Sequence, residues 1–317
     1  MSLSIVRFYQ GQQAPAWGLV NNGKISPLSI DCTTTKALLA YSHQQLCDAA
    51  TAESLDFKGV RLLSPITDNA KVLCQGANYR QHMIDSGMDP DAKRFNMFFT
   101  KSSAAIHEPV GEIIRPQHVK LLDYEIELCL VLAQDTHTTL NVTAQNLHQY
   151  IAGICIGNDI SARDVQIPQM QFHKGKSYRT FCPLGPILCL LTADEMSYLD
   201  NLQLKLAVNG QIRQSDSTRN LVFKPIETLN EFSQIANFNA GDVIMTGTPS
   251  GCALGLPSPA LVRATALLPD NLRFELFNKT QARRPQYLKA GDIVESSIRS
   301  TDGKIDLGVQ HHQIVST

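Results

Sequence analysis

The residues best suited to chemistry are two glutamates, Glu125 and Glu127, at the start of an otherwise apolar run over residues 121–133. In an extended strand, residues two apart point to the same face, so the two carboxylates would lie about 7 Å apart. At an effective dielectric constant of 20 they would repel each other by roughly 2.4 kcal/mol. The run then continues without polar alternation, which is typical of a strand buried on both faces. A solvated strand face and a buried cation site are therefore both open interpretations.

A third carboxylate, Asp159, ends a second apolar run, "IAGICIGND", over residues 151–159. Taken alone, an aspartate in this position is typical of a turn or a helix N-cap. Three converging carboxylates would instead favour a hard divalent cation, because oxygen-only ligation selects Mg²⁺, Mn²⁺ or Ca²⁺ over zinc. Such a cation would reverse the repulsion and keep all three acids ionised.

A candidate base lies in "NYRQHMID", where His82 precedes Asp85 by three residues. If this segment is helical, both side chains lie on one face and can meet. The carboxylate would then orient an imidazole whose ordinary pKa of ~6.5 suits base chemistry near neutrality. A polar helix surface is the alternative. Lys176, in "GKSYRTF", is either a solvated loop lysine or a cation that faces a developing anion.

The elements that must position these residues are mostly short strands. We expect strands in 95–103, 124–133, 151–161, 185–191, 202–210, 211–217, 241–249, 272–278 and 291–298, and hairpin turns at Asn22-Gly23 and Asn209-Gly210. We expect helices near 35–50, at 143–150 and at 228–238, the last opened by a capping box of Thr228 and Glu231 with Leu229, Phe232, Ile235 and Ala236 on one face. Because strands do not alternate with long helices, a β-rich α+β fold is predicted rather than a doubly wound sheet.

The chain divides into a small N-terminal domain, residues 1–65, and a larger domain, residues 66–317, with Pro65 near the boundary. The segment from Gly251 to Arg284 is the least patterned and is interpreted as a loop-rich excursion. The segment from Gly76 to Lys93 contains Gly, Pro and several charges, and we expect it to be a lid that becomes ordered with ligand.

Six motifs, in this order along the chain, resemble the fumarylacetoacetate hydrolase family. They are "GANYRQH" (76–82), "EIELCLVL" (125–132), "GNDISARDVQ" (157–166), "GKSYRTFCPLGP" (175–186), "GDVIMTGTPSG" (241–251) and "YLKAGDIVESSI" (287–298). Each motif alone is only suggestive, whereas six in the right order are specific. The resemblance implies a mixed β-roll catalytic domain, preceded by a small α+β domain, in a homodimer. It also implies that Glu125, Glu127 and Asp159 are the metal ligands.

The resemblance implies further roles for residues that match the family's motifs. His82 and Asp85 stand where the family commonly has a histidine-glutamate dyad, so the acid here is one methylene shorter. Lys176 would bind the oxyanion or other oxygens of the substrate. Arg163 and Gln166 would contact the substrate and support the oxyanion, although Arg163 could equally be a structural salt-bridge partner. The Thr248 hydroxyl would be a substrate contact, and a simple tight turn is the alternative for that residue.

The predicted activity is a Mg²⁺- or Mn²⁺-dependent hydrolysis of a carbon-carbon bond in an acylpyruvate or fumarylpyruvate-like diketo acid, with Ca²⁺ as a further candidate ion. In that chemistry a metal-held substrate departs as an enolate after water attacks the distal carbonyl. One alternative within the family is an isomerase or decarboxylase of a 2-hydroxy-dienedioate or oxaloacetate, which needs no attacking water. A non-catalytic metal- or ligand-binding protein is the alternative from another class.

The composition of the chain argues against nucleic acid and membranes as partners. The chain has 28 basic and 29 acidic residues, with no long basic run, so we expect no nucleic-acid partner. The longest apolar stretches are far shorter than the roughly 20 residues of a membrane helix, and no signal peptide is visible, so a cytoplasmic protein is expected. Eight cysteines with no C-x-x-C pair are typical of reduced core thiols.

Overall fold

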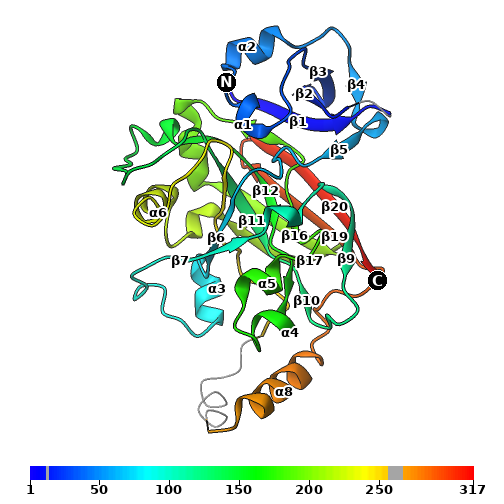
Figure 1. The fold of residues 1–317 in the computed structure, drawn as a ribbon, viewed down its shortest axis with the longest axis vertical. Coiled ribbons are helices and arrows are strands. Elements are labelled where there is room, and N and C mark those ends of the chain that lie inside the picture. The colour runs from blue at the N-terminus through cyan, green and yellow to red at the C-terminus, as the bar shows by residue number, and fades with distance from the viewer. Residues whose placement is uncertain (12–13, 256–266) are drawn as a thin grey trace.

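Two β-sheets dominate the computed structural model, which describes residues 1–11, 14–255 and 267–317 (Figure 1). Within these residues the larger sheet has eleven strands in the order β4-β3-β2-β1-β15-β12-β11-β18-β6-β7, with β5 beside β1. The strands are β1 (Leu3–Tyr9), β2 (Ala16–Asn21), β3 (Lys24–Pro27), β4 (Leu55–Asp56), β5 (Arg61–Leu63), β6 (Val72–Gly76), β7 (Met97–Lys101), β11 (Ile126–Leu132), β12 (Ile151–Asn158), β15 (Leu188–Leu190) and β18 (Val243–Met245).

The second sheet packs against β11 and β12 of the first and runs in the order β17-β16-β19-β20-β9. Its strands are β9 (Val110–Arg115), β16 (Leu202–Val208), β17 (Gln211–Ser217), β19 (Ile293–Ser300) and β20 (Asp306–Ser316). Two short pairs complete the strands: β8 (Ile106–His107) with β14 (Cys182–Pro183), and β10 (Leu122–Asp123) with β13 (Ser161–Ala162). The predicted β-rich α+β fold is confirmed.

The strand that carries the glutamates is buried along its whole length, as its apolar sequence predicts. Every residue of β11 is buried. Ile126, Leu128, Leu130 and Leu132 belong to one large apolar cluster, and Cys129 and Val131 belong to another. Since side chains alternate between faces, Glu125 and Glu127 share the face of Cys129. A solvated strand face is therefore excluded for the two glutamates.

The helices are short, and several predicted helices differ from the structure. The helices are α1 (Thr35–Leu38), α2 (His43–Asp48), α3 (Arg80–Asp85), α4 (Arg163–Gln166), α5 (Phe172–Lys176), α6 (Pro225–Phe232) and α8 (Asp270–Gln281). The helix expected near 35–50 is divided, because Ser42 and Gln45 form a capping box that starts α2. The segment 143–150 contains only a 3-10 turn, Leu147–Gln149.

The predicted start of α6 is wrong, because Pro225 occupies its first turn and sets the helical backbone angle there. Thr228 lies inside the helix, where its hydroxyl accepts a hydrogen bond from Gln75 Nε2 at 2.8 Å. Glu231 accepts hydrogen bonds from Asn96 instead of capping the helix. The expected apolar face is only partly right, since the helix ends at Phe232 and Ile235 is 63% exposed.

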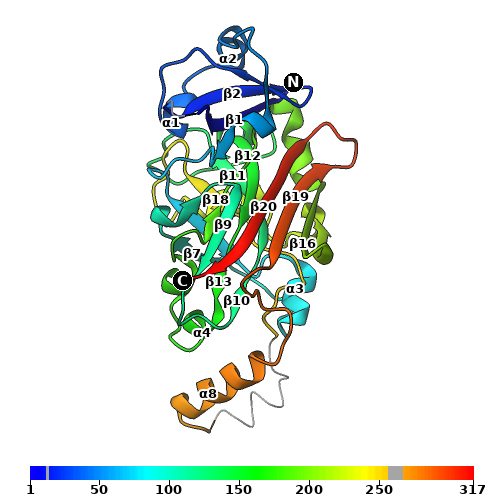
Figure 2. The same cartoon turned by 90° about the vertical axis from the view of Figure 1, so that its right-hand side faces the viewer.

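The N-terminal strands lie at one end of the molecule and α8 at the other (Figures 1 and 2). β1 pairs with β15, so the N-terminal strands extend the larger sheet, and the domain boundary after residue 65 stays a prediction. Both predicted hairpin turns are confirmed, with Asn22, Gly23, Asn209 and Gly210 in the left-handed region.

The predicted strand over 272–278 is wrong, because this segment lies in α8. Its apolar residues alternate like those of a strand, but half of the residues in "DNLRFELFNKTQ" are good helix formers and Asp270 lies in the first turn, where a negative charge favours a helix. Leu272 and Leu276 are 47% and 41% exposed, so no core dictates a strand here. Part of the predicted excursion 251–284, residues 256–266, lies outside the described residues.

All eight cysteines are free thiols, as predicted. In the described part of the chain, no helix combines the length and the apolar character that crossing a membrane requires.

Candidate active site

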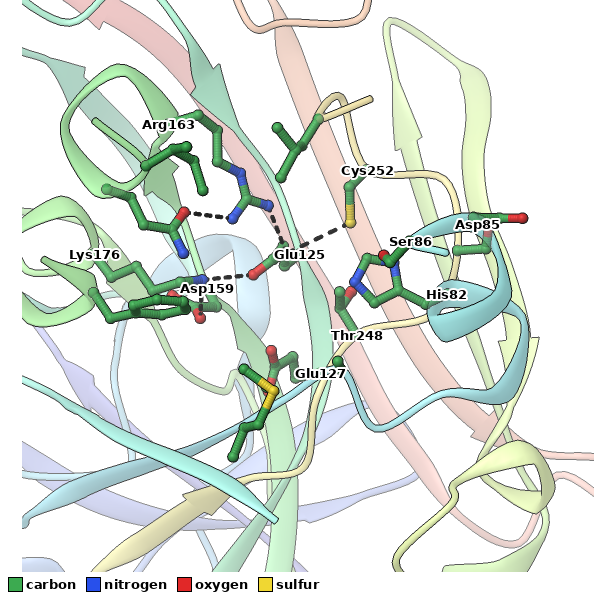
Figure 3. A pocket seen from close by; sticks show the side chains of 18 of the residues that line it. His82, Asp85, Ser86, Glu125, Glu127, Asp159, Arg163, Lys176, Thr248 and Cys252 are labelled. Atoms are coloured by element: carbon green, nitrogen blue, oxygen red, sulfur yellow. Dashed lines mark hydrogen bonds and ion pairs between the residues drawn. The ribbon is translucent and has the colours of Figure 1, made fainter. Parts of the chain in front are cut away.

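The pairing of β11 with β12 brings the three predicted carboxylates together. In this antiparallel pair Ile126 lies opposite Asn158, and the next residue outward, Asp159, donates its backbone N–H to Glu125 O at 2.8 Å. Gly157 lies opposite Glu127 and leaves room on that face, because a Cβ there would lie 2.4 Å from Cys129 Sγ. One oxygen from each of Glu125, Glu127 and Asp159 lies within 4.8 Å of the others, and all three residues are buried (Figure 3).

Buried cations hold two of these carboxylates. Lys176 Nζ lies 2.7 Å from Glu125 Oε2 and 2.5 Å from Asp159 Oδ2. Arg163 lies 2.6 Å from Glu125 Oε1, and Lys101 Nζ lies 2.5 Å from Asp159 Oδ1. Carboxylate oxygens carry two lone pairs each, so these ion pairs still leave acceptor capacity at Glu125 and Asp159.

Glu127 differs from its neighbours, because no ion pair joins it to a cation in the described part of the chain. Its Oε2 accepts the backbone N–H of Gly247 at 2.7 Å. Gly247 adopts a φ of +91°, and a Cβ there would lie 2.9 Å from Asn78 Cβ, so this close approach requires glycine. Burial, then the charges of Asp159 and Glu125, raise the pKa of Glu127 well above its ordinary value.

Glu125 has the opposite balance. Burial raises its pKa, but Arg163 and Lys176 together outweigh burial and hold the pKa below its ordinary value. The same interactions act on Lys176, where burial lowers the pKa while Asp159 and Glu125 raise it further, so the ammonium stays charged.

The cluster fits a divalent cation, both in its donor atoms and in its charge. Among the described residues it contains four buried carboxylates and three buried cations: Asp123, Glu125, Glu127 and Asp159 with Lys101, Arg163 and Lys176. With every acid ionised the cluster is therefore one positive charge short. Three carboxylate oxygens are the donor set that Mg²⁺ or Mn²⁺ prefers, and the charge of an ion beside Glu127 would counteract the burial and the like-charge repulsion that raise the pKa of Glu127.

The cluster opens on a cavity of about 560 Å³ that most of the predicted site residues line. His82, from α3, is directed toward Glu125 and Cys252 (Figure 3). Burial lowers the pKa of its imidazole, while Glu125 acts in the opposite direction. His82, Glu125 and Cys252 each offer one atom within 4.8 Å of the other two.

The predicted contact between His82 and Asp85 is not formed. Both residues lie on α3, as expected, but no hydrogen bond joins them among the residues that the structure describes. Asp85 instead accepts hydrogen bonds from Ser250 Oγ and from Gln81 Nε2, the latter at 2.8 Å. The spacing of three places the two residues on neighbouring turns, but Ser250 competes for the carboxylate.

Lys176 and Arg163 are occupied by the cluster itself. Lys176 Nζ donates to Glu125, Asp159 and Ser161 Oγ, which uses all three of its protons. Arg163 donates to Asp123 and Glu125, and its Nη1 donates to Gln166 Oε1 at 2.8 Å. The salt-bridge alternative considered for Arg163 therefore describes its contacts.

Thr248 lies beside the cluster, but its hydroxyl is committed. The hydroxyl donates to Ile126 O at 2.9 Å and accepts from Gln214 Nε2 at 2.8 Å. Both Thr248 and Gln166 line the cavity, so their predicted substrate contacts stay predictions.

Sequence reasoning missed Lys101, Asp123 and Cys252. Lys101 ends β7, within the motif-free run "FNMFFTKSS", where a lysine after apolar residues was the available signal. Asp123 accepts hydrogen bonds from Arg163 and from the backbone N–H groups of Ala253 and Leu254. Cys252 follows "GTPSG" directly, and its Sγ lies 3.6 Å from Glu125 Oε1.

The predicted lid segment, 76–93, is held together by bonds between its own residues. Lys93 Nζ donates to the carbonyls of Gly76 and Ala77 at 3.1 and 2.7 Å, and Arg80 pairs with Asp91 at 2.6 Å. The segment contributes His82 and Asp85 to the lining of the cavity, while its ordering by ligand stays a prediction.

Comparison with known proteins places this arrangement in a family. The chain is 35% identical over 208 residues to oxaloacetate tautomerase YisK of Bacillus subtilis (strain 168), a match that covers 65% of this chain and 67% of that protein. It is 34% identical over 217 residues to the Homo sapiens protein "Oxaloacetate tautomerase FAHD2A, mitochondrial", with 68% and 67% covered. The matches therefore span about two thirds of these relatives.

The fold agrees with that of solved structures. Fumarylacetoacetate hydrolase (EaFAH) from psychrophilic Exiguobacterium antarcticum superposes with a TM-score of 0.75 at 28% identity, covering 99% of this chain and 100% of that chain. Residues 71–315 match the family described as "Fumarylacetoacetate (FAA) hydrolase C-terminal". The chain belongs to the fumarylacetoacetate hydrolase family.

Proposed function

We propose that the protein is a divalent-metal-dependent enzyme that interconverts the enol and keto forms of a 2-oxo acid by moving a proton at C3. The observation that carries the proposal is an imidazole, His82, that faces the cavity beside Glu125 while its predicted acid partner is bonded elsewhere. The curated relatives named above as oxaloacetate tautomerases support the same class of reaction.

In this proposal three carboxylates bind the metal ion and His82 transfers the proton. Glu125, Glu127 and Asp159 would hold a Mg²⁺ or Mn²⁺ ion. When bound, that ion would accept the carboxylate and 2-oxo oxygens of the substrate and stabilise negative charge that develops on them. His82, whose pKa is lowered by burial, would take the proton from C3 and pass it to the 2-oxo oxygen to form the enol, and it would move the proton from that oxygen back to C3 in the reverse direction.

Lys176, Lys101 and Arg163 would act through the carboxylates. Their hydrogen bonds fix the orientations of Glu125 and Asp159 in the buried site. Carboxylates that are fixed in this way can bind the ion without first having to reorient. None of these three cations needs to touch the substrate for this role.

Carbon-carbon hydrolysis, the activity first predicted, is the second candidate. It is favoured by the likeness to EaFAH, but it needs a base that activates water. Asp85 is bonded to Ser250 rather than to His82, so the predicted dyad would have to form by a side-chain rearrangement that releases Asp85 from Ser250. Tautomerisation requires only one proton-transfer group at C3, which is why we prefer it.

The experiment that tests the proposal compares two reactions in one preparation. Enol-to-keto conversion of oxaloacetate and phenylpyruvate, above the uncatalysed rate, and cleavage of acetylpyruvate should be measured with Mg²⁺, Mn²⁺ or EDTA. We expect metal-dependent tautomerisation that is lost in Glu127→Gln and His82→Gln and retained in Asp85→Asn. Acetylpyruvate cleavage that is lost in Asp85→Asn would favour the hydrolase. Metal binding without turnover of any of these acids would identify a binding protein.

A further inference from the structure

The cavity contains a cation that is not neutralised by the carboxylate cluster. Arg284 lines the cavity together with His82, Arg163 and Lys176. Arg163 and Lys176 are each bonded to two carboxylates. Among the described residues, no carboxylate lies within ion-pair distance of Arg284. Its one hydrogen bond there runs from Nε to the carbonyl of Ala253 at 2.8 Å.

The guanidinium of Arg284 is held against the backbone. A Cβ added to Gly255 would lie 2.3 Å from Arg284 Nη1 and 2.5 Å from Cζ, so the group lies directly against this glycine. Arg284 is partly buried, and its Nη1 and Nη2 groups have no hydrogen-bond partner in the described part of the chain. A fixed planar fork with free donors matches the geometry of a carboxylate.

The loop that holds Arg284 is bonded to the carboxylate cluster. The Gly255 backbone is bonded through both its N–H and its carbonyl to the side-chain amide of Gln281, which is 3% exposed. Ala253 and Leu254 donate their backbone N–H groups to Asp123, the same carboxylate that pairs with Arg163. The position of Arg284 is therefore fixed relative to the proposed metal ligands, as a recognition group must be.

We propose that Arg284 binds a second carboxylate of the substrate, at the end away from the 2-oxo acid group. The proposal rests on the proposed function, since it assumes that the carboxylate cluster takes the 2-oxo acid end. It names the substrate class as 2-oxo dicarboxylates and makes Arg284 the residue that selects them over monocarboxylates. An unpaired guanidinium in a cavity with an apolar part favours a charged group over the aromatic or aliphatic tail of a monocarboxylate.

The test compares ligands that share the 2-oxo acid end and differ at the other. Calorimetry on the Mg²⁺-loaded protein should give the dissociation constants of oxaloacetate, 2-oxoglutarate, 2-oxoadipate and oxalate, of which oxalate mimics the 2-oxo acid end and has no distal carboxylate. In Arg284→Gln we expect the tightest dicarboxylate to bind about 10- to 100-fold more weakly, as expected for a lost charge-assisted pair. Oxalate should bind within about twofold of the wild-type value, which also shows that the variant is folded.

Two further variants sharpen the result. Arg283→Gln removes the neighbouring exposed charge and should leave both classes of ligand unchanged. Gly255→Ala retains the charge but displaces the guanidinium, and should weaken dicarboxylates while sparing oxalate.

Equal weakening of oxalate and dicarboxylates in Arg284→Gln, or no weakening of either, would overturn the inference. Turnover separates this failure from failure of the proposed function. If the wild type tautomerises both oxaloacetate and phenylpyruvate and Arg284→Gln does not change their relative KM, the function stands and the inference is wrong. If no acid is tautomerised, the proposed function is wrong, and the binding comparison still decides the role of Arg284.

Discussion

Replacing Lys101 with methionine removes the positive charge from a fully buried ion pair. The side chains of Lys101 and Asp159 are both 0% exposed, with Nζ and Oδ1 2.5 Å apart. At an effective dielectric constant of 20 the attraction is about 6.6 kcal/mol, and the cost of burying the two ions, several kcal/mol each, offsets much of it. Removing one partner leaves Asp159 partly uncompensated, so we expect the free energy of unfolding to fall by about 3–5 kcal/mol.

Urea denaturation followed by circular dichroism measures this loss. Circular dichroism is preferable to fluorescence because the one tryptophan, Trp17, lies in β2 and reports on the N-terminal strands. Lys205→Met, a matched change at an exposed position of β16, should alter stability by less than about 0.5 kcal/mol. Saturating Mg²⁺ should reduce the loss in Lys101→Met, because an ion among the three carboxylates supplies positive charge near Asp159.

A double-mutant cycle with Asp159→Asn isolates the pair. If the two side chains interact as described, the double variant should be more stable than the sum of the single losses predicts, by about 1–3 kcal/mol. A loss below about 1 kcal/mol in Lys101→Met, with no coupling to Asp159 and no response to Mg²⁺, would refute the reasoning.

Three other predictions concern the same cavity. Mg²⁺ binding should release protons, because burial, then Asp159 and Glu125, raise the pKa of Glu127 in the ion-free protein. Calorimetry in buffers of different ionisation enthalpy measures this release, which Glu127→Gln should abolish. The tautomerase kcat/KM should fall only at acid pH, below the ordinary histidine pKa of ~6.5. The reason is that burial lowers the pKa of His82, so the imidazole stays neutral down to that lower pKa. A decline in kcat/KM that begins above pH 7 would contradict the role of His82 as the base. Mass spectrometry after thiol labelling should find that the exposed Cys47 is modified first and that Cys252 is protected until the protein unfolds. The reason is that Cys252 is buried and burial raises the pKa of its thiol. Early labelling of Cys252 would count against its position beside Glu125.

The sequence could predict that the two glutamates lie together, because the geometry of a strand determines which side chains share a face. An unbroken apolar run predicts that β11 is buried on both faces, and the two-residue period then places Glu125 and Glu127 together. Asp159 joins them through the pairing of β11 with β12, which period and composition do not specify. The apolar run that Asp159 ends made this residue a candidate, and the family resemblance implied that it joins the two glutamates.

Side-chain contacts between segments far apart in the chain could not be predicted from the sequence. Nothing in the run that contains Lys101 specifies that it meets Asp159, and Ser250 captures Asp85 across 165 positions of sequence. The error at α8 has a different cause, since a short alternation of apolar residues fits a helix as well as a strand when neither face is buried. Pro225 was the stronger helix-start signal for α6, and a capping-box pattern inside the helix concealed it.

The bonds between Gly255 and Gln281 close the base of the segment between them, and Asp123 fastens the adjoining backbone to the floor of the cavity. Insertions or deletions between Gly255 and Gln281 should therefore cost little entropy and should not displace the proposed metal ligands. Such a change of length is expected to alter the rim of the cavity instead, while the proposed metal ligands keep their positions.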